Sequence, residues 1–115
     1  MQLSKSIRDN LHFLIAEVDS QVSNLHSCIE TDSPIVAQHI LDRSGYAYNL
    51  KMRIHDSCLG QISRCKIADA QIQALRAAES IATSLERIAE LCRDCVHQMG
   101  YIKQKRCLRS GGFAA

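Results

Sequence analysis

Residues that bend or interrupt a chain are scarce in this sequence. It has no Trp, only five Gly among 115 residues, and a single Pro at position 34, and just 4% of its residues are aromatic. The shortage of aromatic residues means that any core must be aliphatic. The shortage of Gly and Pro leaves few sites for turns, which favours a few long helices over many short strands.

Long apolar stretches are also missing. No run approaches the roughly 18 apolar residues of a membrane-spanning helix, and the first residues lack the continuous apolar region of a signal peptide. A hydrophobic content of 46% with 23% charged residues is that of a globular protein, and 115 residues suffice for one domain with a modest core. We therefore expect a soluble protein of the cytoplasm.

The net charge of +2 is unevenly placed. The segment 103–109 holds four of the 14 basic residues, so the rest of the chain has 10 basic residues against 12 acidic ones. This balance excludes a body-wide basic surface for nucleic acid. The basic segment suits the negative end of a helix dipole. Contact with an acidic partner or a membrane surface is the alternative interpretation.

Apolar residues recur at helical spacing in three segments. The first runs to about Glu30, the second from Pro34 to about Arg64, and the third from about Ala70 to Lys105. Ser4 or Ser6 is expected to cap the first helix, and Asp32 or Ser33 to cap the second, with Pro34 at its first position. Gly45 lies inside the second helix and predicts a kink or a close helix approach there.

The apolar spacing also predicts which residues are buried. Steps of three and four residues are typical of a helix seam that packs against neighbouring helices. The predicted seams are Leu3, Ile7, Leu11, Leu14, Val18, Val22, Leu25 and Ile29 in the first helix; Val36, Ile40, Ala47, Leu50, Ile54, Cys58, Ile62 and Cys65 in the second; and Ile81, Leu85, Ile88, Cys92, Cys95, Met99 and Ile102 in the third.

Three long helices joined by short turns predict an all-α fold, an up-down-up antiparallel three-helix bundle. We expect one domain over residues 1–108, with Gly111 and Gly112 marking a flexible tail over 109–115. The third helix is apolar over a broad face, because its seam is flanked by further apolar residues, Leu75, Ala78, Ala82, Ala89 and Val96. Such a face suits a helix that contacts both neighbours, and it could equally leave one edge for a partner subunit.

The third segment carries a recognisable motif. Leu85, Glu86, Arg87 and Ile88, followed by Ala89 and Glu90, resemble the signature of the PhoU family of phosphate-uptake regulators. That family has a Gly and an Asp where Ala89 and Glu90 stand. The second helix is similar to its family counterpart at Leu50, Ile54, Cys58, Leu59, Ile62 and Arg64, and the resemblance extends over residues 7–105.

The resemblance implies a non-enzymatic regulatory or adaptor module that modulates the transport of phosphate or a related ion. Its implied partner is a transporter subunit or a sensor protein, and it would touch a membrane only through that transporter. Full-length PhoU proteins contain two such three-helix repeats and this chain contains one, so pairing into a homodimer is expected. No Ser/His/Asp nucleophile arrangement and no Gly-rich phosphate loop stands in the sequence, which also favours a protein that is not an enzyme.

Metal binding is the alternative function. Glu86, Glu90 and Asp94 repeat every four residues, so their carboxylates share one helix face, and hard oxygen ligands at this spacing suit a divalent ion such as Fe, Mn, Mg or Zn. Glu86 and Glu90 also occupy the ligand motif that the resemblance implies. Asp94 and His97, one turn further on, are candidates for further ligands. Most of the family's acidic partners on the second helix are replaced here, by Ser44, Gly45 and Tyr48. A solvated face neutralised by Arg87 and Arg93 is the competing interpretation.

Six Cys are present, and two of them form a C-x-x-C pair, Cys92 and Cys95. Such pairs serve redox and zinc chemistry, but this one is predicted in mid-helix on an apolar seam. Buried thiols that pack as hydrophobic groups are therefore expected. His12, Asp19 and His26 recur every seven residues, about 10 Å apart, which is too far for one metal ion and indicates a solvated stripe.

Overall fold

The computed structural model describes residues 2–64 and 68–114, with side chains through Lys105. These residues form four helices and no strand: α1 (Lys5–Thr31), α2 (Pro34–Asp42), α3 (Tyr46–Arg64) and α4 (Asp69–Ala114). The predicted all-α bundle is confirmed at this level. Cys65 and part of the predicted turn before Asp69 lie outside the described residues.

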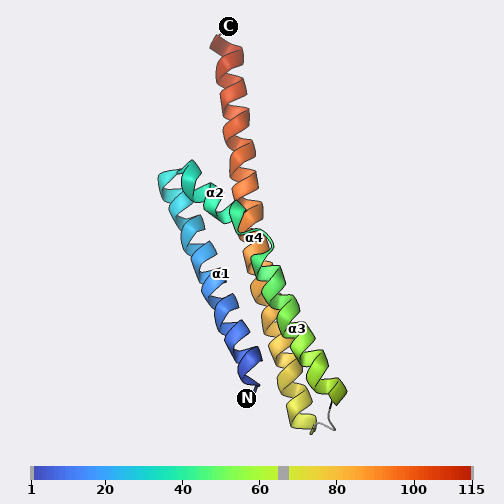
Figure 1. Ribbon diagram of the computed structural model, residues 1–115. Helices are drawn as coiled ribbons and strands as arrows, with labels where there is room; N and C mark the ends of the chain where they lie inside the picture. The colour runs from blue at the N-terminus through green and yellow to red at the C-terminus, as the bar shows by residue number, and fades with distance from the viewer. Residues whose placement is uncertain (1, 65–67, 115) are drawn as a thin grey trace.

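The helices run side by side along most of the molecule (Figure 1). The chain rises through α1, crosses through the short α2, returns through α3 and rises again through α4, so α1 and α4 point in the same direction. The molecule is elongated, measuring 73 × 19 × 18 Å, because the 46 residues of α4 alone span about 69 Å. The last turns of α4 extend beyond the ends of the other helices.

Local signals set the ends of α1 and α2 largely as the sequence predicts. The Ser4 side chain caps α1 by accepting a hydrogen bond from the Ile7 amide. Asp32 ends the same helix in the left-handed conformation, where its amide donates to the Cys28 carbonyl. Ser33 then caps α2 through the Val36 amide, with Pro34 at the start of the helix. Each side-chain cap satisfies a backbone donor that a helix start leaves unpaired.

The predicted helix over 34–64 is divided in two at Arg43–Gly45. The chain leaves the helical path because Gly45 adopts a φ of 89°, a conformation that residues with a Cβ atom rarely take. The break is compact, since the Ser44 amide donates to the Leu41 carbonyl and the Tyr46 amide to the Arg43 carbonyl. It frees the nine residues of α2 to lie across α1 and α4 instead of continuing the line of α3.

The core is aliphatic, as expected, and its larger part joins α1, α3 and α4. Large side chains from α1 and α3 pack there against small ones from α4. The buried members are Ile7, Leu11, Leu14, Val18, Ala47, Leu50, Ile54, Cys58, Leu75, Ala78, Ala82 and Ala89. A second, smaller cluster forms where α2 crosses, from Cys28, Ile40 and Val96. The small alanine side chains let α4 approach its neighbours closely.

In the part of the chain that the structure describes, no helix combines the length and apolarity needed to cross a membrane. Helix α4 is assigned through Ala114. The expected limit of the domain at residue 108, with a flexible tail over 109–115, stays a prediction.

Candidate interaction surface

Helix α1 carries a row of exposed apolar residues beside its buried seam. Ile15, Val22 and Ile29 follow one another at seven-residue steps, and all three are about half exposed or more. Val22 and Ile29 were predicted to be buried, and that prediction is wrong. The buried stripe of α1 instead continues from Val18 through Gln21 to Cys28. Three large aliphatic side chains are thereby left outside the core.

Helix α4 carries a second exposed row, and the predicted seam of this helix is partly wrong for the same reason. Its buried stripe consists of Ala74, Leu75, Ala78, Ala82, Ala89, Cys92 and Val96, with Leu85 partly buried against it. The stripe lies about one residue away from the predicted seam, so four seam members, Ile81, Ile88, Cys95 and Ile102, are exposed. Leu91, which the seam omitted, is exposed beside them.

Side-chain contacts that α1 and α4 make with other parts of the chain show in which direction the two rows point. On α1, Glu17 bonds to Arg43 at the α2–α3 break, and Ile15 is two residues, or about 200°, away from it around the helix. On α4, Glu79 and Glu86 contact His55 and Lys51 of α3, and Ile81 and Ile88 are again two residues on. Both rows therefore turn away from α3 and meet on the side where α1 and α4 lie next to each other.

We call this side the α1–α4 face. Its seven large members are each between 39% and 64% exposed: Ile15, Val22, Ile29, Ile81, Ile88, Leu91 and Ile102. Single exposed apolar residues are normal, but rows of them on adjoining helices are typical of surfaces that bind another protein. The sequence held a signal for this face, because each row keeps a strict seven-residue repeat beside a second, buried repeat.

The acidic residues proposed as metal ligands lie elsewhere on α4. Glu86 pairs with Lys51 across to α3 at 3.7 Å, and Glu90 pairs with Arg87 on its own helix at 3.3 Å. Asp94 is exposed one turn further on. Among the described residues, no group of three or more His, Cys, Asp and Glu side chains is placed to hold a metal ion. A ligand role for Glu86, Glu90 and Asp94 stays a prediction.

The cysteines divide by burial. Cys28, Cys58 and Cys92 are buried and reduced, whereas Cys95 is exposed on α4. Burial raises the pKa of the Cys92 thiol, and it raises that of Cys58 to about 11. A reactive thiol needs the opposite shift. The raised pKa of Cys92 therefore argues against an activated thiol at that position, and the buried cysteines pack as small hydrophobic groups.

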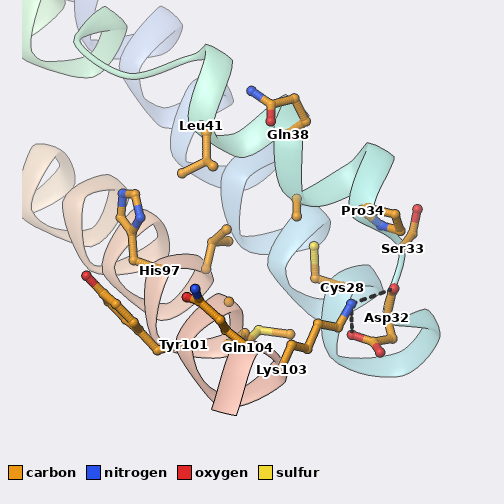
Figure 2. A pocket seen from close by; sticks show the side chains of 14 residues that line it. Cys28, Asp32, Ser33, Pro34, Gln38, Leu41, His97, Tyr101, Lys103 and Gln104 are labelled. Carbon is orange, nitrogen blue, oxygen red and sulfur yellow. Dashed lines mark hydrogen bonds and ion pairs between the residues drawn. The ribbon is translucent and has the colours of Figure 1, made fainter. Parts of the chain in front are cut away.

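A hollow lies where α2 crosses α4, near the C-terminal end of α1. Figure 2 shows it between Leu41, the Cys28 thiol and Tyr101, with the ion pair of Lys103 and Asp32 on one side. The Lys103 ammonium lies 2.8 Å from the Asp32 carboxylate, so its charge is already compensated. The cavity measures about 420 Å³ and is mostly apolar. No set of polar groups converges in it to define a ligand.

Comparisons with known proteins do not place the chain in a family. No protein-family model matches it, and no curated protein or solved structure matches it either. The resemblance to PhoU proteins consequently depends on the sequence motif around Leu85–Ile88 and on the second-helix pattern.

Proposed function

We propose that this protein is a non-enzymatic regulatory or adaptor module that acts by binding other proteins through its α1–α4 face. The observation that carries the proposal is the double row of exposed aliphatic residues on α1 and α4. An elongated helical bundle presents long exposed helix faces, and such faces suit helix-to-helix docking. Burying half-exposed Ile, Leu and Val side chains supplies the driving force for such docking.

The resemblance to PhoU proteins suggests what the module regulates. Three of the four residues of the Leu85–Ile88 motif divide between structure and surface: Leu85 packs against the core, Glu86 pairs with Lys51, and Ile88 belongs to the α1–α4 face. A motif that couples the bundle interior to a docking surface fits an adaptor. The proposed role is to damp the transport of phosphate or a related ion from the cytoplasmic side, through a transporter subunit or a sensor protein.

Phosphate uptake tests this role directly. Cells of the source organism that lack the gene are expected to accumulate radiolabelled phosphate faster than wild-type cells under phosphate-rich conditions. Re-expression of the wild-type chain or of Ser23→Glu should restore damping, because Ser23 is exposed next to the face without belonging to it. Val22→Glu should not restore it. Unchanged phosphate uptake in the deletion strain would refute a PhoU-type role.

A further inference from the structure

The large aliphatic side chains of the α1–α4 face remain 39% to 64% exposed in the single chain. We infer that two copies pair through this face in antiparallel orientation, about a two-fold axis that passes beside Val22. This inference rests on the proposed function only because both use the α1–α4 face. It names the occupant of that surface as another molecule of this protein, and it defines the register of the pair.

The small core cluster shows how α1 and α4 are aligned along the length of the bundle. Cys28 of α1 and Val96 of α4 pack together in it, and the two helices run in the same direction (Figure 1). Val22 precedes Cys28 by six residues and Glu90 precedes Val96 by six residues, so Val22 and Glu90 lie at the same position along the bundle. A two-fold axis at this level, perpendicular to the helices, places α1 on the partner's α1 and α4 on the partner's α4 in reversed direction.

The apolar residues then match. On α1, Val22 faces its own copy, and Ile15, seven residues before it, faces Ile29, seven residues after it. On α4, Ile88 and Leu91 flank the axis on opposite sides and face each other across the pair. Each aliphatic side chain near the axis therefore meets another aliphatic side chain, which an unrelated partner need not provide.

The charges at the rim match as well. Arg87 and Asp94 are exposed on the outer edge of α4, three residues before the axis and four residues after it, so each faces the other in the partner. On α1, Asp19 and His26 are exposed and have the same relation to Val22, so these two polar side chains face each other in the pair. Opposite charges thus meet along the edge of α4, whereas a parallel arrangement would lay α1 on α4 and lose this pairing. Complementary rim charges select the orientation of a complex.

The size of the face fits a reversible dimer. The part in which α1 accompanies α4 and both copies overlap runs from residue 81 to 99 of α4, about 27 Å at 1.5 Å per residue. Two helices are about 20 Å wide, so roughly 540 Å² per copy would be covered, or about 1,100 Å² in total. This area is at the lower limit of specific interfaces. We therefore expect a weak, reversible dimer.

Sedimentation equilibrium of the full chain from about 1 µM to 1 mM tests the pair. Wild type should shift from monomer to dimer. Val22→Glu, which places two carboxylates at the axis, should raise the dimer dissociation constant at least about tenfold, and Ser23→Glu should leave it within about threefold. Far-UV circular dichroism checks that both variants remain helical. A wild-type monomer at 1 mM, or a dimer that Val22→Glu leaves intact, would overturn the inference.

Charge reversal tests the orientation. Arg87→Asp and Asp94→Arg should each weaken the dimer, since each places like charges opposite each other, and the double variant should recover most of the loss. Failure of the double variant to recover would contradict the antiparallel register. The two proposals can fail separately. A monomeric protein that still damps phosphate uptake would refute self-pairing alone, whereas a dimer without any effect on uptake would refute the regulatory role alone.

A disulfide provides an independent measure of register. Ser84 and Cys95 are exposed and lie on opposite sides of the axis at nearly equal distance, so Ser84→Cys should form a cross-linked dimer with Cys95 of the partner on mild oxidation. In the wild type, the two copies of Cys95 would be about 15 Å apart along the helices, too far for a disulfide. Rapid linkage of Cys95 to Cys95, or no linkage in the Ser84→Cys dimer, would overturn the register.

Discussion

Arg43, at the break between α2 and α3, clamps the buried carboxylate of Glu17 on α1. The Arg43 Nη2 atom lies 2.7 Å from Glu17 Oε2, and Nε lies 2.9 Å from Oε1. The Glu17 side chain is 4% exposed, but that of Arg43 is 50% exposed and stacks over the Tyr46 ring. Gln21 donates a further hydrogen bond to Glu17. This contact ties the helix break to α1 and so fixes where α2 crosses.

Removing Arg43 should therefore destabilise the fold. Arg43→Met leaves a buried carboxylate without its charged partner. We expect a loss of about 1–2 kcal/mol, less than for a fully buried pair, because solvent screens the half-exposed Arg43. Urea denaturation followed by circular dichroism measures the loss. The exposed Arg53→Met variant on α3 is the control, with a change below about 0.5 kcal/mol. Equal stability of the two variants would show that the clamp is unimportant.

The same contact predicts how stability varies with pH. The hydrogen bond from Arg43 lowers the pKa of Glu17 below its ordinary value, against the opposing effect of burial. The unfolded chain therefore takes up a proton at Glu17 before the folded protein does. The stability that the ionised Glu17 contributes is complete above the unfolded pKa of about 4.3. It is lost as the pH falls through the lower folded pKa. Glu17→Gln should remove this part of the acid sensitivity when urea midpoints are compared between pH 6 and pH 3.

Two glycines should respond oppositely to substitution by Ala. Gly45 has a φ of 89°, so Gly45→Ala strains the backbone at the helix break and should destabilise the protein by about 1 kcal/mol. Gly100 lies within α4, and a Cβ atom added there would meet open space, since no atom lies within 4 Å of its position. Gly100→Ala should stabilise the protein by about 0.5–1 kcal/mol. Thermal denaturation of both variants gives the signs, and a stabilising Gly45→Ala would contradict the strained turn.

Thiol reactivity should follow burial. The exposed Cys95 is expected to react with iodoacetamide at neutral pH at least about tenfold faster than Cys58 or Cys92, because the buried thiols are shielded and their raised pKa values keep them protonated. Mass spectrometry of the digested protein assigns each modified thiol. In urea the rates should converge. Fast native alkylation of Cys92 would instead favour a redox role for the Cys92–Cys95 pair.

Metal content distinguishes the two functions considered from the sequence. Because Lys51 and Arg87 already neutralise Glu86 and Glu90, we expect protein purified without chelators to contain less than about 0.1 equivalent of Fe, Mn or Zn. Elemental analysis by mass spectrometry measures this, with Glu86→Ala as the matched variant. One equivalent of metal that is lost in Glu86→Ala would establish Glu86 as a ligand and revive the metal-binding alternative.

The sequence by itself determined the helical class and most of the core of α1 and α3, and it narrowed each cap to two residues, of which the structure selects Ser4 and Ser33. These features follow from local chemistry: caps satisfy backbone donors next to them, and Leu50, Ile54 and Cys58 recur every four residues on one face of α3. Ile62, the next member of that predicted seam, is 46% exposed, so its predicted burial is wrong. The interruption at Gly45 was visible as a weak point, but whether the helix would bend or divide depended on the Arg43 contact with α1.

Only the tertiary structure decided which apolar stripe of α4 is inside. That helix has two adjoining stripes, one rich in Ala and one rich in Ile, and hydrophobicity alone favours the larger side chains for burial. Close packing of three helices reversed this choice, because Ala78, Ala82 and Ala89 allow a short distance between helix axes that Ile81 and Ile88 would prevent. The larger residues were thereby left on the α1–α4 face, where a second molecule can cover them.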